Sequence, residues 1–506
     1  MSRRSFLCIL SVFIVLSLLS GCETGDDRST SLSESSTSET LPIVMEELPP
    51  IDITMGLVTY VYSSKPLSVP GYASKVDEML AKLNKKAQDD GLNITLKIKW
   101  LPKPYDLEAA REGGYDYDCD VYYTSIEQAQ ELFEEGYILR LNDLVKEKTP
   151  DYYSMLMTRP YMKKALGIDD YDEFPLCFLP SNRVGSNIYY VMMEKEIAEK
   201  YDIKISSIED YVDALGKIKE GGEPKTPGNF NTLYFLDEYM RDRGYYQFLS
   251  VLFYAKYDDP SYNVYSAADV DDFYQLMELL KRIFSEKFAE DSIDIYKALA
   301  LGQTSSIIDN PGLWMTTKYT FRKDKEYAVF PLTSNNDYLR LGSGLVIGSS
   351  AQNPERIMTF INWLYSDQEN MDIWLYGGFE NEKNDFYTLD EKGRILYNKP
   401  TDPFYEWLGT AGDILFDMRL ARVPYYLPEN FVEIYEESLN KTTLEKKLSN
   451  PSYMLEPGTP EYEDWSKLGD LSQYNPLIRT FWQVCTDPKF DVNGFIKEMK
   501  SAGLDD

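Results

Sequence analysis

The chemistry open to this chain is first limited by a residue type that it lacks, because none of its 506 residues is histidine. Without histidine there is no Ser-His-Asp triad, no Cys-His pair and no His-ligated zinc or iron site. One metal-like spacing exists: Asp116, Asp118, Asp120 and Glu127 match positions 1, 3, 5 and 12 of a calcium loop. Val121 stands where such a loop needs a glycine for its sharp turn. We therefore predict no metal site and no cofactor.

Carboxylates are abundant, with 83 Asp and Glu against 52 Lys and Arg and a formal charge of −31 at pH 7. Suitably separated carboxylates cleave glycosides, so a secreted carbohydrate-active hydrolase stays open, as does a lyase that uses Tyr and Arg. The acidic excess argues against nucleic acid as a partner, because phosphate recognition needs a basic face. Hydrophobic residues make up 43%, which is ordinary for a folded protein.

Tyrosine is the other prominent residue type: it occurs 41 times, and aromatic residues together reach 14%. A flat apolar ring with a hydroxyl suits a partly wet binding surface, although tyrosine also favours strands in general. Which tyrosines are accessible to a ligand depends on the helices and strands in which they lie.

The N-terminus has the pattern of an export signal. Arg3 and Arg4 precede an apolar run at 6–19, which ends in Leu19-Ser-Gly-Cys22. This ending resembles the bacterial lipid-attachment motif, so we predict a signal peptide over 1–21 and lipid attachment at Cys22. Removal of the signal deletes two positive charges and no acid. The twin arginines leave the twin-arginine and general export routes both open, and a plain membrane anchor is the alternative interpretation.

The residues after Cys22 are rich in Ser, Thr and acid as far as position 45. Such a composition buries too little surface to fold, so we predict a flexible tether over 22–48. The remaining cysteines, Cys119, Cys177 and Cys485, are odd in number and widely spaced, and the chain has no CxxC. The spacing therefore supports neither a zinc site nor a thioredoxin-like motif.

From position 51 the chain alternates between strand and helix patterns. Residues 51–60 and 94–100 predict strands, and apolar residues at helical spacing between 76 and 87 predict a helix that ends near Gly91. A further strand is predicted at 119–123, and Ser125 is expected to cap the helix that follows. This alternation predicts an α/β domain with a mainly parallel sheet.

A second unit is predicted to begin near residue 174. It contains strand patterns at 188–192, 305–309, 327–333 and 345–348. It also contains a helix that opens at Ser207, a helix-rich stretch over 233–283, a helix after Asn353-Pro354 and a mainly helical tail that ends near 503.

Short sequence patterns along the whole chain carry a family resemblance. The clearest is 344–365, a strand followed by a Pro-capped helix with Asn362-Trp-Leu364 near its end. Other such patterns stand at 120–124, 136–143, 201–210, 387–395 and 491–503. In this order, and with the lipid-attachment motif, they resemble the carbohydrate-type (family 1) extracellular solute-binding lipoproteins of ATP-driven importers. Residues 400–475 match that family only loosely.

The resemblance implies an α/β, two-lobed periplasmic-binding-protein-like fold of type II, with a hinge between the lobes and a disordered N-terminal tether. Its first lobe would be formed by 49–176 plus 342–380, and its second lobe by 177–338 plus 381–506. The chain would cross between the lobes near 174–179 and again near 339–343.

A ligand would then bind between the lobes, since open α/β sheets leave a crevice at the carboxyl ends of their strands. The resemblance places ligand contacts in the loops at this edge. The candidate ligand-binding residues are Tyr60, Tyr62, Tyr123, Thr124, Arg183 and Trp314.

The resemblance implies a binding protein and not an enzyme. It would capture a solute, with oligosaccharides favoured over peptides, and deliver it to the permease subunits of an ABC importer. The protein would be a monomer, anchored by lipid at the extracellular face of the cell membrane. Besides the carbohydrate-active enzyme, a lipoprotein that reports its ligand to a membrane sensor stays open.

Overall fold

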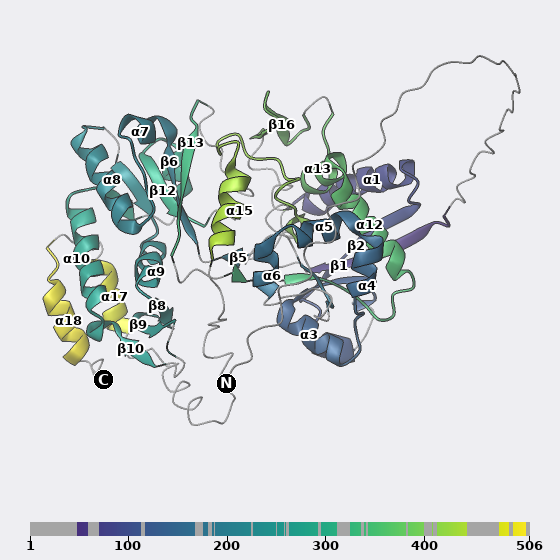
Figure 1. The fold of residues 1–506 in the computed structure, drawn as a ribbon, viewed down its shortest axis with the longest axis horizontal. Coiled ribbons are helices and arrows are strands. Elements are labelled where there is room, and N and C mark those ends of the chain that lie inside the picture. Colours follow the sequence, from purple (N-terminus) through teal and green to yellow (C-terminus); the bar gives the residue numbers. More distant parts are fainter. Residues whose placement is uncertain are drawn as a thin grey trace, which may run out of the picture. The chain divides into compact units, whose positions relative to one another are not determined.

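The computed structural model describes the chain in segments (Figure 1). These are residues 48–58, 70–112, 117–166, 176–180, 185–186, 188–223, 226–248, 250–257, 259, 263–291, 295–310, 324–334, 339–340, 343–380, 383–398, 407, 412–442, 475–484 and 489–501. The predicted signal peptide and tether lie outside them, apart from Leu48. Individual predictions that also lie outside them concern Cys22, Tyr60, Tyr62, Arg183, Trp314 and Cys485.

A first sheet has the strand order β2-β1-β3-β15-β4. Its strands are β1 (Ile51–Val58), β2 (Ile94–Leu101), β3 (Val121–Ser125), β4 (Leu179–Pro180) and β15 (Ser343–Ile347). β1 is parallel to β2 and β3, whereas β15 is antiparallel to both β3 and β4. The predicted strands of the first unit are confirmed, and the sheet is mixed because β15 returns to it from far along the chain.

Helices cover this sheet, and α1, α12 and α13 lie together beside it (Figure 1). The buried side of α1 consists of the apolar residues that predicted it, and Gly91 follows its C-cap with a φ of 81°. The helices are α1 (Tyr72–Asp89), α2 (Leu107–Glu112), α3 (Ile126–Glu134), α4 (Asn142–Lys148), α5 (Pro150–Met157), α6 (Pro160–Leu166), α12 (Pro354–Ser366) and α13 (Gln368–Tyr376). We call this sheet and its helices the first lobe.

The Asn-Trp-Leu pattern has a structural role within the first lobe. The Asn362 carboxamide accepts a hydrogen bond from the Asp151 N–H at 2.8 Å and donates one to the Asp151 carboxylate at 2.8 Å. Trp363 donates its indole N–H to Asp90 at 2.9 Å. The pattern thus fastens α12 to the start of α5 and to the end of α1.

A second sheet has the strand order β11-β7-β12-β6-β13. Its strands are β6 (Tyr189–Glu194), β7 (Thr226–Phe230), β11 (Ala289–Asp291), β12 (Thr304–Asp309) and β13 (Tyr327–Leu332). β7 is parallel to β11 and β12, and β6 is antiparallel to β12 and β13. The predicted strands at 188–192, 305–309 and 327–333 are confirmed.

Helices from two parts of the chain pack on the second sheet and form the second lobe with it. Ser207 caps α8 as predicted, since its hydroxyl accepts the N–H of Asp210 at 3.1 Å. The helices are α7 (Lys195–Lys200), α8 (Ile208–Glu220), α9 (Thr232–Asp242), α10 (Asp271–Ser285), α11 (Ile295–Ala300), α17 (Asn475–Val484) and α18 (Val492–Ser501). Apolar residues of α17 and α18, such as Phe481 and Phe495, join the same core as those of β7, α8 and α10.

The helix-rich stretch predicted over 233–283 is partly wrong. Between α9 and α10 lies an antiparallel sheet of order β10-β9-β8, formed by β8 (Tyr245–Phe248), β9 (Ser250–Lys256) and β10 (Val264–Ser266). β9 was misassigned because residues 251–255 are buried without interruption, so that the alternation typical of a half-buried strand is missing. Gly244, with a φ of 87°, turns the chain from α9 into β8.

The two predicted crossings between the lobes meet as a short antiparallel ribbon. β5 (Gly185–Ser186) follows β4, β14 (Leu339–Arg340) precedes β15, and Leu339 pairs with Ser186. β4 is still hydrogen-bonded to β15 of the first sheet, and the predicted positions of the crossings stay a prediction.

Residues 383–442 add a hairpin and a helix, formed by β16 (Tyr387–Leu389), β17 (Ile395–Tyr397), the 3-10 turn η5 (Gly412–Leu415) and α15 (Phe431–Lys441). Their buried residues, among them Trp407 and Tyr435, belong to the hydrophobic core of the first sheet. The same core reaches one face of the second sheet through Tyr190 and Tyr327, whereas the neighbouring Val191 faces the second core. The predicted lobe boundaries, which gave 381–506 to the second lobe, stay a prediction.

The described residues thus form a mixed α/β protein with two principal sheets, as predicted. Among them, no helix combines the length and apolar character needed to cross a membrane.

Candidate functional site

The strand directions define one edge of each sheet where carboxyl ends gather. In the first sheet, β1, β2 and β3 end at Val58, Leu101 and Ser125, and β15 begins beside Ser125. In the second sheet, β7 and β12 end at Phe230 and Asp309, beside the start of β6. Ligands of open α/β sheets bind at such edges, so both were searched for suitable side chains.

At the edge of the first sheet, the predicted residues Tyr123 and Thr124 point to opposite faces because they are neighbours in β3. Thr124 is fully buried, and its hydroxyl donates to the Tyr105 carbonyl at 2.6 Å. The Tyr123 side chain is half-buried, and its carbonyl accepts the Tyr105 N–H at 3.0 Å. The geometry leaves Tyr123 accessible and gives Thr124 the task of holding the loop after β2.

The Tyr105 ring that Thr124 holds is itself part of a buried aromatic group. It stacks on Tyr122 with a centroid distance of 4.0 Å and an interplanar angle of 15°, and Tyr117 lies 6.0 Å away. The Tyr122 hydroxyl donates to the Tyr117 carbonyl at 2.5 Å. These contacts fix the loop after β2 against β3 and so stabilise this edge of the first sheet.

The edge of the second sheet carries a pair of stacked tyrosines. Tyr189 opens β6 and Tyr234 lies in the first turn of α9, just after β7, and their rings are 5.2 Å apart at 28°. Asn231 begins α9 at this point by accepting the Leu233 N–H at 2.9 Å. Both rings are half-buried, so each keeps part of its surface open to solvent.

Charged side chains of α9 contact the ring and the hydroxyl of Tyr189. The Arg241 guanidinium, fully buried, lies 5.5 Å from the ring centroid, which is within cation–π range. The Tyr189 hydroxyl hydrogen-bonds to Asp237, whose pKa is raised by burial. Arg241 is itself paired with Glu238 in the same helix. The tyrosine pair is therefore supported by a buried polar network in α9.

Asp309 ends β12 at the same edge and is a buried carboxyl group, with 2% of its surface exposed. Its Oδ1 accepts the Asn310 N–H at 2.7 Å, and its other oxygen accepts the Tyr296 hydroxyl from α11. Burial raises the pKa of Asp309 to about 7, against the lowering influence of the Asn310 N–H. Both oxygens of this buried carboxyl group are thus engaged by groups of the fold.

The structure thus brings together residues that the sequence analysis did not select. Tyr189, Tyr234 and Asp309 share one edge, and Tyr123 and Thr124 stand at the other sheet's edge. Tyr234 was missed because β7, whose sequence Thr-Pro-Gly-Asn-Phe contains two strand breakers, was not predicted. Asp309 was recognised only as the end of a predicted strand. No pattern in the sequence indicated that Tyr189 and Tyr234 would stack. The other predicted ligand contacts lie outside the described residues.

A separate pocket of 580 Å³ lies at the opposite end of β6, between α7, β13 and the start of α15. Its three basic lining residues each have an acidic partner: Lys195 pairs with Glu326 at 3.2 Å, Arg394 with Asp390 at 2.8 Å, and Lys392 with Glu429. Because this pocket lies at the edge of the sheet opposite to the carboxyl ends of β7 and β12, we do not assign the ligand to it.

The acidic spacing around Asp120 is used within the fold. The Asp120 carboxylate accepts the Thr54 N–H at 2.8 Å, which ties β3 to β1. Within the described part of the chain, no group of three or more acidic or cysteine side chains is arranged to hold a metal ion. Cys119 and Cys177 are free and buried, and burial raises the pKa of each thiol to about 11.

Comparison with known families gives one match. The profile described as "Bacterial extracellular solute-binding protein" matches residues 80–371, which is more than half of the chain. The match begins within α1, so it leaves out β1 but covers the other strands of both sheets. A search of curated proteins gives no match.

Solved structures of similar outline are distant in sequence. The N-glycan transport solute binding protein of Streptococcus pneumoniae is 16% identical with a TM-score of 0.49, over 90% of this chain and 95% of that chain. A family 1 extracellular solute-binding protein of Alicyclobacillus acidocaldarius is 12% identical with a TM-score of 0.49, over 91% and 100%. The GacH receptor of Streptomyces glaucescens is 13% identical with a TM-score of 0.42, over 90% and 99%. At these values no detail of a ligand site is carried over.

Proposed function

The chain belongs to the family of bacterial extracellular solute-binding proteins, and on this premise we propose that it captures an oligosaccharide between its lobes and delivers it to an ABC permease. That family is defined by binding and not by catalysis, in agreement with the prediction that the protein is not an enzyme. The observation that carries the choice of ligand is the stacked pair Tyr189–Tyr234 beside Asp309 at a strand-end edge.

A sugar ring presents C–H groups on its faces and hydroxyls around its rim. The open surface of the tyrosine pair suits the faces, because aromatic rings bury apolar area at a small cost in conformational freedom. Asp309, whose oxygens accept the Asn310 N–H and the Tyr296 hydroxyl, fixes the strand end beside these rings. This combination of apolar surface with a few placed polar groups is typical of small-molecule sites.

The remaining ligand contacts of the proposal come from the other predicted residues. Tyr60 and Tyr62 follow β1, and Trp314 follows β12 in the sequence. Arg183, between β4 and β5, offers a guanidinium with fixed donor geometry. Tyr123 is accessible at the first sheet and completes the set. These assignments are part of the proposal.

Closure of the lobes on the ligand is the second part of the proposal. The β5–β14 ribbon supports it, since two chain crossings that lie side by side allow rotation about one short segment. A ligand shifts the balance between open and closed forms only by its different affinity for the two.

The family is extracellular, and we propose attachment through Cys22, followed by a tether to residue 48. Two or three acyl chains on one cysteine would hold the protein durably, since each buried CH₂ contributes about 0.8 kcal/mol. Cys22→Ala is expected to release the protein into the medium or to leave uncut precursor in the membrane. Wild-type protein that stays soluble without detergent after processing would contradict the anchor.

Binding is tested by titration calorimetry of the purified full chain against maltotriose, mannotriose, xylotriose and tri-N-acetylchitotriose, with a tripeptide of similar size for comparison. We expect one trisaccharide or more to bind and to raise the melting temperature, because a ligand at 100 times its Kd adds about 2.7 kcal/mol. Tripeptide binding alone would overturn the choice of ligand. Breakdown of a trisaccharide during incubation would overturn the assignment as a binding protein.

A further inference from the structure

α15 contacts elements of both lobes. It packs against α6 of the first lobe and against β13 of the second. The chemistry of the two contact surfaces differs, and the difference indicates which lobe α15 moves with.

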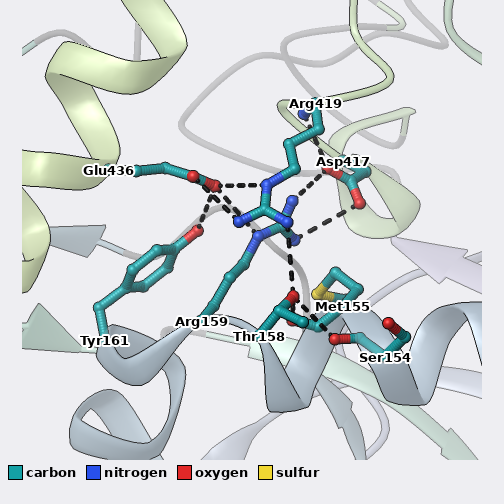
Figure 2. A network of polar contacts seen from close by, with 8 residues as sticks. All are labelled: Ser154, Met155, Thr158, Arg159, Tyr161, Asp417, Arg419 and Glu436. Carbon is teal, nitrogen blue, oxygen red and sulfur yellow. Dashed lines mark hydrogen bonds and ion pairs between the residues drawn. The ribbon is translucent and has the colours of Figure 1, made fainter.

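The contact with the first lobe is an ionic network around the buried Arg159, and Arg419 takes part in it from the surface (Figure 2). Arg159, between α5 and α6, is 1% exposed, and its guanidinium donates to both oxygens of Asp417, at 2.7 and 3.4 Å. Its Nε donates to the Glu436 carboxylate on α15 at 3.1 Å. One arginine therefore joins the α5–α6 corner, the loop at residue 417 and α15.

Two further groups hold Glu436 in this network (Figure 2). The Arg419 guanidinium donates to both of its oxygens at 3.1 Å each, and the Tyr161 hydroxyl donates at 3.3 Å. Arg419 also donates to the Thr158 hydroxyl at 3.4 Å. Displacement of α15 from α6 would separate several charges at once and would leave Arg159 buried without its partners, which is costly.

The contact of α15 with Tyr190 of the second lobe is made by neutral groups, and the loop before α15 adds a backbone hydrogen bond from the Tyr327 N–H to the Tyr426 carbonyl at 3.3 Å. The Ser438 hydroxyl donates to the Tyr435 carbonyl at 2.7 Å, so the Tyr190 hydroxyl is the donor in its hydrogen bond with Ser438. The rings of Tyr190 and Tyr435 are stacked with centroids 6.3 Å apart at 28°. Stacked rings tolerate a range of offsets, and one hydroxyl pair is a modest interaction.

We propose that α15, with the loop at 412–430, moves as part of the first lobe, and that its surface against Tyr190 is the joint that slides when the lobes rotate. This inference rests on the hinge motion of the proposed function. It adds that the contact between α15 and Tyr190 is the one that changes during that motion. It also implies a lobe boundary after residue 442, in place of the predicted one at 381.

The test measures distances between spin labels in the full chain without added ligand. One pair joins exposed Glu437 of α15 to exposed Ala81 of α1 in the first lobe; the other joins Glu437 to exposed Asp213 of α8 in the second. Labels are attached to introduced cysteines in a background with Cys8→Ser, Cys22→Ser and Cys485→Ser. The buried thiols of Cys119 and Cys177, with a pKa of about 11, react slowly.

The variant is Tyr190→Phe with Ser438→Ala, which removes the hydroxyl pair and keeps the stacked rings. Its matched control is Tyr211→Phe with Ser306→Ala, since these hydroxyls form an equally buried pair at 2.9 Å inside the second lobe. We expect the variant to shift or broaden the 437–213 distribution and to leave 437–81 unchanged, and the control to change neither.

Any change in the 437–81 distribution, or an unchanged 437–213 distribution, overturns the inference. Because no ligand is used, these outcomes are independent of the trisaccharide titration. The two experiments therefore distinguish a protein that binds a trisaccharide but lacks the sliding joint from one that has the sliding joint but binds no trisaccharide.

Discussion

The carboxyl-end edges of the two sheets use their polar and aromatic residues differently. At the first edge, the described side chains bind their own backbone: Thr124 holds the Tyr105 carbonyl, and Asp106 accepts the Ala109 N–H at 2.7 Å. At the second edge, Tyr189 and Tyr234 keep part of their ring surface exposed, and Asp309 is a buried acid with a raised pKa. The polar groups at the first edge hold the fold and leave Tyr123 accessible there, whereas the second edge offers a pair of partly exposed stacked rings.

This difference teaches that position at a strand end is not enough to assign a ligand contact. A side chain is available to a ligand only if the fold does not already use its polar atoms and its surface. Partly exposed stacked rings fulfil this condition better than a threonine whose hydroxyl is bound to the backbone, and better than Asp309, whose two oxygens already accept the Asn310 N–H and the Tyr296 hydroxyl. The comparison gives three predictions, from the largest effect to the smallest.

The largest expected effect is the pH dependence that Asp309 gives to stability. Its pKa in the fold is about 7, against an ordinary value of 3.8. Between these values the folded protein keeps the proton and the unfolded chain loses it, so this group's contribution to the free energy of unfolding falls as pH rises. The loss is at most about 1.4 kcal/mol for each pH unit.

Asp309→Asn removes this contribution. Relative to wild type, the variant should therefore gain stability as pH rises through this interval, as measured by urea unfolding of both proteins at matched pH. A stability difference that stays constant with pH would show that Asp309 has an ordinary pKa, and the contrast between the two edges would lose its electrostatic part.

The second prediction concerns ligand binding at the tyrosine pair. Tyr234→Ala removes one stacked ring from the second edge and is expected to weaken binding of the trisaccharide identified above by about 1 to 3 kcal/mol, which is typical of well-placed aromatic contacts. Calorimetric titration gives the Kd. The matched control is Tyr274→Ala, an exposed tyrosine on α10 that is 37% accessible, for which the Kd should stay the same.

Equal affinity of Tyr234→Ala and wild type for the trisaccharide would place the ligand elsewhere. An equal loss in Tyr123→Ala would instead show that the two edges contribute alike, so that the comparison fails while the crevice stands.

Most of the fold could be predicted from local patterns. The α1 stripe, the β2 alternation and the Ser207 cap each depend on neighbouring residues alone, and all of them are found in the structure. The prediction failed at β9, where burial on both faces removes the alternation that distinguishes a strand from a buried helix. It also missed β7, whose Pro227 and Gly228 disfavour strands but fit here, because Tyr211 and Leu215 lie where a Cβ at Gly228 would stand.

The candidate site was harder to predict because it depends on pairings between distant residues. Tyr189 and Tyr234 are brought together only by the order of β6, β12 and β7 in the sheet, which local patterns do not specify. The raised pKa of Asp309 arises from burial, and burial is a property of the folded chain. Sequence could identify strand ends, but not which of their side chains the fold had already used.

The smallest expected effect belongs to Thr124, which was predicted to contact the ligand and which the structure shows to be bound to the Tyr105 carbonyl. Thr124→Val keeps the shape of the side chain and removes the hydroxyl, so it should cost about 1 kcal/mol of stability, the usual net value of one such hydrogen bond. Trisaccharide affinity should not change. Thr124→Ser, which keeps the hydroxyl, is the control and should retain most of the stability. Urea unfolding and the same calorimetric titration measure both quantities. If Thr124→Val instead weakens binding and leaves stability intact, the hydroxyl serves the ligand, and the first edge takes part in binding as the sequence had suggested.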